Sequence, residues 1–368
     1  MKKTIKRFVA IISLLLIPIV LFCMTQRNVN HNTLRIQGFY QEEKNSIDVL
    51  FFGASDVSNG FSPGLAYGEY GYTSYPYTVD ANKTEFFVSQ IKEALRYQSP
   101  KCIVVEITGC LSGVYSDDEQ KLAVMRQFTD EMPISMNKIS IINQFVNNDK
   151  LSYYFPAIAH HGQLSNISSF YTRMKQTIRG YTLLKGIVTS NAKQEYDQIM
   201  DVNDDLSTLP VSDNTGVIEE LLEYCKTLDT KVLFVRFPHR ITNEVGYKEL
   251  KRANEFGRII ESNGFEFINF DHAIGEIGLD LENDFYSDSH LNVHGQIKLT
   301  RYFSEILTKH YSLGKSDLSQ QNIERWKKSY EYTKLFYQYY YMHENDPVDY
   351  WYETPELIQD LDLLRDIQ

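Results

Sequence analysis

Two polar stretches, far apart in the chain, contain residue types that together can carry out acyl chemistry. Ser55 ends a short turn after an apolar run, and His290 lies in a later stretch that also contains Asp284 and Asp288. A serine hydroxyl becomes a nucleophile when a histidine accepts its proton, and a carboxylate beside that histidine orients the ring. We therefore predict a site with Ser55 as nucleophile, His290 as base and one of the two aspartates as the acid. The alternative is that Ser55 only caps the following helix, as serine often does.

The apolar run before Ser55 predicts the strand that positions it. Residues 47–52 are rich in β-branched and aromatic side chains, which is typical of a buried strand. Ligands bind beyond the carboxyl ends of the strands in an open α/β sheet, which is where Ser55 falls. Further strands are predicted at 102–107, 231–237 and 265–270, and helices at 82–97, 216–227, 247–262 and 293–311. This alternation predicts an α/β fold with a parallel sheet.

Four stretches depart from this alternation. Residues 28–46 are a polar connector, and 64–75, rich in Gly and Tyr, are predicted to be an ordered loop. Residues 111–209 are polar, lack a strand rhythm and are predicted to be a helical insertion that covers the Ser55 end of the sheet. Within it, one helix is expected to begin at 130–133 and another to span 163–178. The Tyr-rich tail at 316–368 is either an amphipathic helix packed on the 47–315 domain or an aromatic surface for carbohydrate or lipid headgroups.

The N-terminus predicts a membrane segment. Basic residues precede an apolar stretch at 8–24, which contains Pro18. A cleaved signal peptide is the alternative, but the residues that follow lack the small-x-small cleavage pattern. We therefore expect 1–27 to form a cytoplasmic tip and an uncleaved anchor, with the remainder of the chain outside the cell.

Composition excludes several classes of protein. The formal net charge of −11, without a basic stripe, argues against nucleic-acid binding. Cys23, Cys102, Cys110 and Cys225 are too few for a disulfide framework and have no metal-ligand spacing. No metal or organic cofactor is expected.

Other polar residues are candidates for binding substrate. His239 and Arg240 follow a predicted strand end and are expected to face the same crevice as Ser55; Arg240 could bind a phosphate or carboxylate. His160 and His161 lie in the insertion and either line the substrate entrance or are solvated. Asp56 either contacts substrate or caps the next helix.

The turn at 53–56, taken with the stretch from Asp288 to Gly295, resembles the SGNH or GDSL-type hydrolase superfamily. The similarity is greatest to its membrane-anchored Gram-positive branch, which is akin to teichoic-acid D-alanylation and polysaccharide O-acetylation proteins. Further similarity lies at 60–63, 132–138, 154–156, 160–161 and 181–186, so the resemblance runs from about residue 47 to residue 307.

The resemblance implies a flavodoxin-like three-layer fold, with Ser55 as nucleophile and His290 as general base. The family places its aspartate three residues before the histidine, where this chain has Ser287. Asp288 and Asp284 are the nearest substitutes. The expected oxyanion donors are the backbone N–H of Ser55 and the Asn82 side chain.

These features predict an extracytoplasmic serine acyltransferase or esterase that acts on a cell-envelope polysaccharide or teichoic acid. The expected partners are the glycopolymer or acyl donor, the membrane and a multi-spanning membrane acyltransferase. Ser287 at the aspartate position favours a rival, in which a catalytically degenerate accessory protein binds an envelope polymer or that acyltransferase. A carbohydrate-binding module that uses the tail is a third reading.

Overall fold

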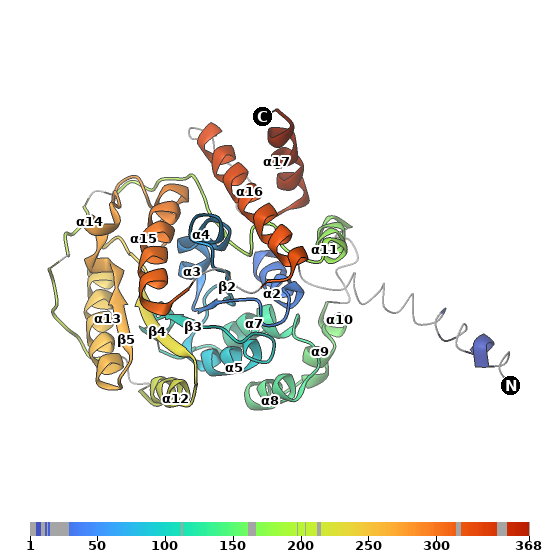
Figure 1. Cartoon of the computed structure of the whole chain (residues 1–368). Helices are drawn as coiled ribbons and strands as arrows, with labels where there is room; N and C mark the ends of the chain where they lie inside the picture. The colour runs from blue at the N-terminus through green and yellow to red at the C-terminus, as the bar shows by residue number, and fades with distance from the viewer. Residues whose placement is uncertain are drawn as a thin grey trace.

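A five-stranded, wholly parallel sheet forms the centre of the computed structural model (Figure 1). The strands are β1 (Val49–Phe52), β2 (Ser74–Pro76), β3 (Cys102–Glu106), β4 (Lys231–Arg236) and β5 (Glu266–Asn269), in the order β2-β1-β3-β4-β5. The structure describes residues 5–8, 12, 14, 29–111, 113–160, 167–196, 198–202, 204–211, 215–313, 318–343 and 352–367.

Helices cover both faces of the sheet, which explains why its strands are apolar on both sides. Along β1, Leu50 and Phe52 face the core shared with α5 (Thr84–Ala94), α12 (Thr215–Lys226) and α13 (Glu244–Ser262). Val49 and Phe51 face the opposite core, shared with α4 (Pro63–Tyr70), α14 (Ile274–Ile277) and α15 (Val293–Tyr311). The result is the three-layer α/β architecture expected from the sequence.

The strand order places a topological switch point beside β1. From β1 the chain passes to β2 on one side and then to β3 on the other. In doubly wound sheets, the crevice at such a point, beyond the carboxyl ends of the strands, is where ligands bind. Ser55 begins α3 (Ser55–Gly60) directly beyond the end of β1.

The predicted strands and crossover helices are confirmed, whereas two predicted loops are wrong. The connector at 28–46 contains α2 (His31–Gln41), which begins in a capping box where Asn30 and Thr33 bond each other's backbone N–H. This helix forms because Ile36 and Phe39 bury themselves in the core beside α5. The stretch at 64–75 forms most of α4 and, with Pro76, β2.

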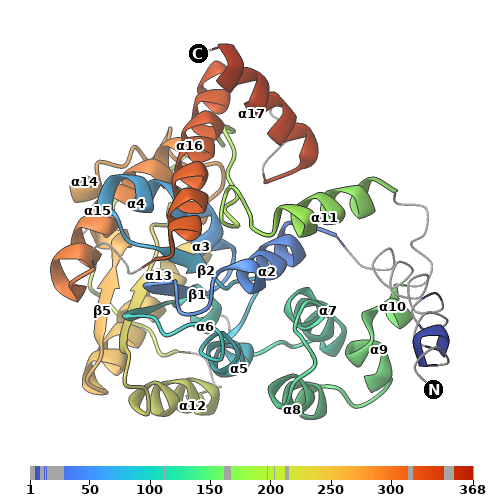
Figure 2. The ribbon, with the colours of Figure 1, turned by 45° about the vertical axis from the view of Figure 1, so that its right-hand side comes forward.

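The insertion is helical in its first part. It contains α7 (Asp118–Thr129), α8 (Met136–Phe145), α9 (Lys150–Tyr154), α10 (Pro156–Ala159) and α11 (Ile167–Arg179). Capping by Ser135 starts α8 beyond the expected opening at 130–133. Helices α7 and α8 pack on α2 and α5, at the side of the sheet rather than over Ser55 (Figure 2).

The described residues between α11 and α12 form no helix or strand, and this part of the insertion does run along the Ser55 end. Val188 N donates to Ser58 O, and Val293 N donates to Ser190 O. Farther along, Met200 N donates to Ile241 O, so the segment connects α3 with the loops after β4 and before α15.

The Tyr-rich tail packs as a helix on the domain. It forms α16 (Gln320–Met342), which lies on α4, and α17 (Pro355–Ile367), which lies on α16. Trp326 and Phe336 are fully buried. The Tyr337 hydroxyl donates to Gln296 on α15 and the Tyr340 hydroxyl to Thr189 O. These aromatic residues therefore belong to the core and are not an exposed stacking surface.

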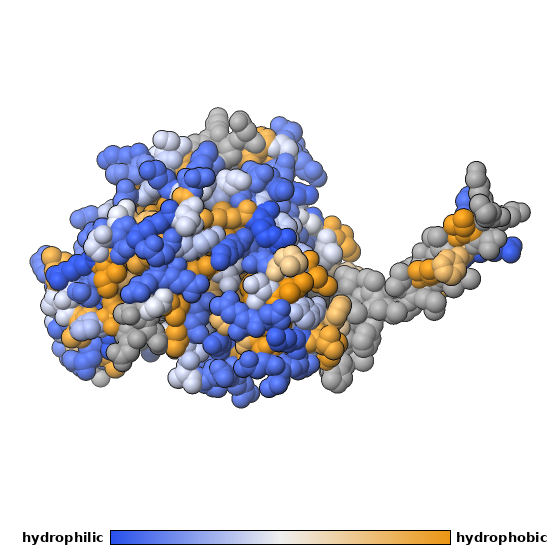
Figure 3. All heavy atoms as spheres, turned by 90° about the horizontal axis from the view of Figure 1, so that it is seen from below, coloured by the Kyte–Doolittle hydropathy of each residue, from blue (hydrophilic) through white to orange (hydrophobic). Residues whose placement is uncertain are grey.

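Among the described residues, no helix combines the length and the apolar character needed to cross a bilayer. Most of the predicted anchor at 1–27 lies outside the described residues, as does Cys23. The surface seen from below is largely hydrophilic with apolar patches (Figure 3). The most exposed large apolar side chains of the insertion's α8–α10 region are Ile134, Met136, Leu151, Phe155 and Ile158.

We predict that truncating Phe336 to Ala lowers the free energy of unfolding by about 3 kcal/mol, because a fully buried phenylalanine is lost from the α16 contact. Urea unfolding measures the change. The matched control is Glu331→Ala on the exposed side of α16, which should change stability by less than about 0.5 kcal/mol. Equal effects of the two variants would contradict the packed position of the tail.

Candidate functional site

A sharp turn after β1 presents Ser55. Gly53 adopts a φ of +155°, and a Cβ there would lie 2.8 Å from Val57 Cγ2 and 2.9 Å from Glu106 Cβ. Only glycine fits both the conformation and the space. The chain can therefore leave the sheet and begin α3 within two residues. The Ser55 N–H lies in the first turn of this helix, where backbone N–H groups have no intrahelical acceptor.

The loop before α15 brings His290 to Ser55. His290 Nε2 lies 2.8 Å from Ser55 Oγ. The loop is closed by a bridge between Phe285 and Leu291, and Tyr286 N donates to His290 O. The Tyr286 ring stacks on the imidazole at 5.3 Å with only 9° between the planes. These contacts determine both the position of the histidine and the plane of its ring.

A hydroxyl occupies the other side of the imidazole. Ser287 Oγ lies 2.9 Å from His290 Nδ1, and Ser289 Oγ lies 3.4 Å away. When Nε2 accepts the Ser55 proton, Nδ1 carries the ring's own hydrogen and donates it to Ser287. Burial lowers the pKa of His290, although the charge of Asp56 opposes this effect. The neutral form, which can accept a proton, is therefore favoured.

Neither predicted acid contacts His290, and this part of the sequence prediction is wrong. Asp288 Oδ2 accepts from the Thr242 hydroxyl at 2.9 Å, and Arg240 N bonds the Asp288 carbonyl. Asp284 is buried and forms an ion pair of 2.6 Å with Lys298 on α15. Each carboxylate is therefore held by a partner on another segment, and Ser287 takes the position beside Nδ1.

Asn82 is also misassigned as an oxyanion donor. Its side-chain amide donates to Gly53 O at 2.9 Å and to Gln90 Oε1 at 2.8 Å. Both amide hydrogens are therefore used, and the side chain supports the backbone that leads to Ser55. Of the two predicted donors, the backbone N–H of Ser55 remains.

The residues predicted to bind substrate do not lie together in the structure. His160 bonds Asp130 at 2.9 Å within the insertion, and its helix α10 lies away from α3 in both ribbon views. His161 lies outside the described residues. Arg240 is buried, donates to Leu281 O and lies 4.2 Å from the Tyr196 ring centre.

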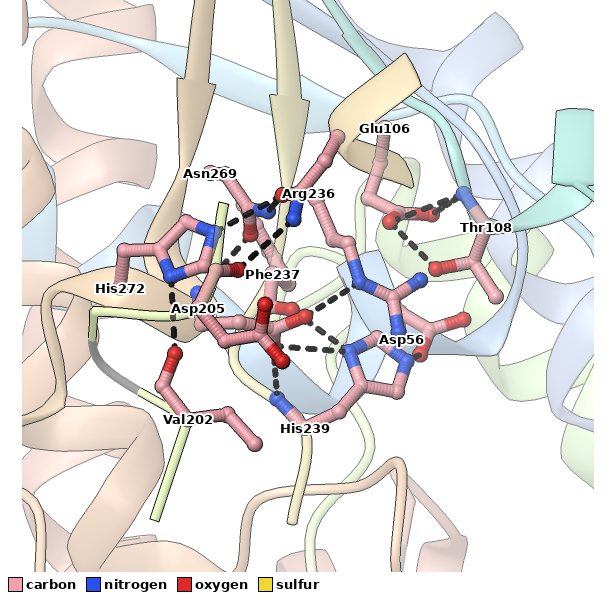
Figure 4. A network of polar contacts seen from close by, with 12 residues as sticks. Asp56, Glu106, Thr108, Val202, Asp205, Arg236, Phe237, His239, Asn269 and His272 are labelled. Carbon is pink, nitrogen blue, oxygen red and sulfur yellow. Dashed lines mark hydrogen bonds and ion pairs between the residues drawn. The ribbon is translucent and has the colours of Figure 1, made fainter. Parts of the chain in front are cut away.

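Asp56, the residue after Ser55, and His239 come together in a cluster of buried charges that the sequence did not predict (Figure 4). His239 Nε2 lies 3.2 Å from Asp56 Oδ1, and His239 N donates to Asp271 at 2.7 Å. Arg236 Nε donates to Asp271 at 2.5 Å, and Glu106 accepts from the N–H and hydroxyl of Thr108.

The cluster residues that the sequence analysis did not predict share one signal: each is a charged residue at or just after the end of a strand. Glu106 and Arg236 are the last residues of β3 and β4, and Asp271 follows β5 within the short turn η1 (Phe270–His272). Carboxyl ends of parallel strands meet at one edge of the sheet, so these positions converge. Arg236 is fully buried and paired with Asp271.

Burial and pairing act against each other in this cluster. Burial, reinforced by the Asp56 charge, raises the pKa of Glu106 to about 7. Burial and Arg236 disfavour a charged His239, yet Asp271 and Asp56 raise its pKa to about 10. Although burial opposes it, His239 holds the pKa of Asp56 below its usual value. The cluster therefore contains a charged His239 beside an ionised Asp56.

Fold and site together define a doubly wound α/β protein with a Ser–His pair at its switch point and a buried charge cluster that begins at the next residue, Asp56. No family model matches the chain, and no curated protein sequence matches it either.

We predict that Asp271→Asn lowers the free energy of unfolding by about 3 kcal/mol at pH 7, because it leaves Arg236 and His239 without their shared carboxylate. Burial opposes ionisation, but Arg236 lowers the pKa of Asp271 to about 2. A carboxylate with a lowered pKa stabilises the fold above about pH 4, and this contribution is lost as the pH falls towards 2.

Urea unfolding between pH 7 and pH 2 tests this prediction, and the gap between wild type and variant should narrow below about pH 4. The control is Asp229→Asn at an exposed position, for which little change is expected at any pH. A gap that stays constant down to pH 2 would contradict the assignment.

Proposed function

We propose that the chain is a serine acyltransferase or esterase. The observation that carries the proposal is the 2.8 Å contact between Ser55 Oγ and His290 Nε2 at the carboxyl end of β1. A nucleophile and a base within hydrogen-bond reach are the geometric signature of covalent acyl catalysis. The low pKa of the buried imidazole, set by desolvation, supports its role as base.

In the proposed reaction, Ser55 Oγ attacks an ester carbonyl while His290 Nε2 takes the hydroxyl proton. The tetrahedral intermediate places its oxyanion at the Ser55 N–H. The intermediate collapses when the ester C–O bond breaks and the protonated His290 gives its proton to the departing alcohol. Water or a second hydroxyl group, deprotonated by His290, then releases the acyl group from Ser55 and regenerates the serine.

The sequence resemblance supports our proposal for the substrate, and the N-terminal residues support our proposal for the location. The turn at 53–56 and the stretch at 288–295 support assignment to the SGNH or GDSL-type hydrolases, in the branch that acts on teichoic acids and envelope polysaccharides. We propose an envelope glycopolymer as acceptor or substrate. The basic and apolar N-terminal residues support a single-pass anchor with the catalytic domain outside the cell.

A second candidate is an accessory protein without turnover, favoured by one specific observation. His290 Nδ1 faces Ser287 instead of a carboxylate, so the imidazolium formed during the reaction lacks its usual partner. In that role, the exposed apolar side chains at 134–158 are a surface for a membrane acyltransferase.

We predict that the wild-type chain hydrolyses small acyl esters slowly and reacts with a fluorophosphonate probe. Ser55→Ala should abolish labelling and lower hydrolysis at least about a hundredfold, because the nucleophile is lost. The control is Ser99→Ala at an exposed position, where the probe signal should persist. Unlabelled wild type, or labelling that survives Ser55→Ala, would favour the accessory protein.

We predict that Ser287→Asp raises kcat/KM about tenfold, since it places a carboxylate beside His290 Nδ1. Ser287→Ala should have the opposite effect because the ring loses its orienting hydroxyl. Ester hydrolysis measured across pH 5–9 compares the three chains. A Ser287→Asp variant no faster than wild type would show that the missing acid does not limit the reaction.

A further inference from the structure

The charge cluster next to Ser55 contains a buried ion pair that takes no part in the catalytic steps proposed above. Asp56 and His239 are each less than a tenth exposed, and their facing atoms lie 3.2 Å apart. Asp56 directly follows the nucleophile in the first turn of α3. Two further contacts hold His239 in position: its backbone N–H donates to Asp271, and its ring Nδ1 bonds Phe237 O. The pair therefore fixes a buried negative charge on the residue that follows Ser55.

We propose that Asp56, held in place by His239, supplies electrostatically the negative charge that the missing carboxylate would give to His290. The inference deepens the proposed function and rests on it. When Ser55 gives its proton to His290, a positive charge forms on a ring whose Nδ1 faces only serine hydroxyls. A buried negative charge nearby stabilises that imidazolium more than a solvated one does. Asp56 is thus a positioning residue and touches no substrate.

The other charged groups around His290 are already engaged. Asp284 pairs with Lys298, and Asp288 bonds Thr242 while facing Arg240 at 4.0 Å. Asp80, after β2, pairs with His31 at 2.5 Å, and its side chain is one-third exposed, so solvent screens its charge.

The charge of His239 also acts on the ring, and Tyr286 stacks on it. Arg236 and Glu106 lie behind the pair, and Arg236 is held by Asp271. Asp56 is therefore the ionised, buried carboxylate best placed to act on His290. The charge of Asp56 affects the pKa of His290 more than the charge of His239, which works in the opposite direction.

The test measures the pKa of His290 directly, so it does not depend on turnover. Imidazole NMR signals of the ¹⁵N-labelled full-length chain are followed from pH 4 to pH 9. We expect Asp56→Asn to lower the pKa of His290 by about one unit, because an opposite charge is lost. His239→Gln should also lower it, because the buried Asp56 loses the charge that keeps its own pKa below the usual value and takes up a proton. A general loosening of the fold would instead raise the pKa of His290, because burial is what lowers it.

Two further variants sharpen the comparison. Asp288→Asn, in the same loop as His290, should leave the pKa of His290 within about 0.3 unit of wild type, a smaller change than a direct charge contact produces. Adding Ser287→Asp to Asp56→Asn should return the pKa of His290 to its wild-type value. In ester hydrolysis, Asp56→Asn should lower kcat/KM about tenfold, the equivalent of one pKa unit, and the double variant should recover it.

The outcomes separate the two proposals. An unchanged pKa in Asp56→Asn, or an equal fall in Asp288→Asn, overturns the role of Asp56 whatever the activity. The predicted shifts in a chain that hydrolyses no ester confirm the coupling of Asp56 to His290 and reject the proposed function. Where Asp56→Asn does not fold, judged by its melting curve, His239→Gln decides: an unchanged or raised pKa of His290 overturns the inference.

Discussion

The parallel alignment of the strands is the constraint on which the site depends. All pairings of β1 to β5 are parallel, so their carboxyl ends lie along one edge of the sheet. Ser55, Glu106, Arg236 and Asp271 each stand at or just beyond such an end. Residues far apart in sequence therefore meet without any local signal that links them. Ser55 and His290, which are 235 residues apart, come within 2.8 Å in this way.

Buried charge at this edge is costly, and the pairing pattern shows how the chain tolerates it. Arg236 and Asp271 are fully buried, and an unpaired charge there would destabilise the fold by several kcal/mol. Each positive group faces a carboxylate. Glu106 is a third carboxyl group, and burial and Asp56 raise its pKa to about 7. It can therefore bind a proton, which removes the excess negative charge. The same arrangement leaves Asp56 ionised next to Ser55, so a stable core and a polarised site have a common origin.

The segments outside the sheet frame the site as well as the core. The irregular part of the insertion bonds α3 and the start of α15, which carry or flank Ser55 and His290. Helix α16 reaches the same region through Tyr337 and Tyr340, whose hydroxyls bond Gln296 and Thr189 O. The segments that carry or flank Ser55 and His290 are thus connected to the tail, for which the sequence left packing on the domain and an exposed aromatic surface as alternatives.

The sequence by itself determined the α/β class, the four main strands, the crossover helices and the pairing of Ser55 with His290. These follow from hydrophobic periodicity and from the rule that parallel strands align their carboxyl ends. It did not identify α2 or β2, because a capping box and a three-residue strand are weak local signals. Only the tertiary structure decided which side chain faces Nδ1 and where Asp284, Asp288 and Asn82 point. Those choices depend on partners from distant segments, such as Lys298, Thr242 and Gln90, whose positions no local pattern encodes.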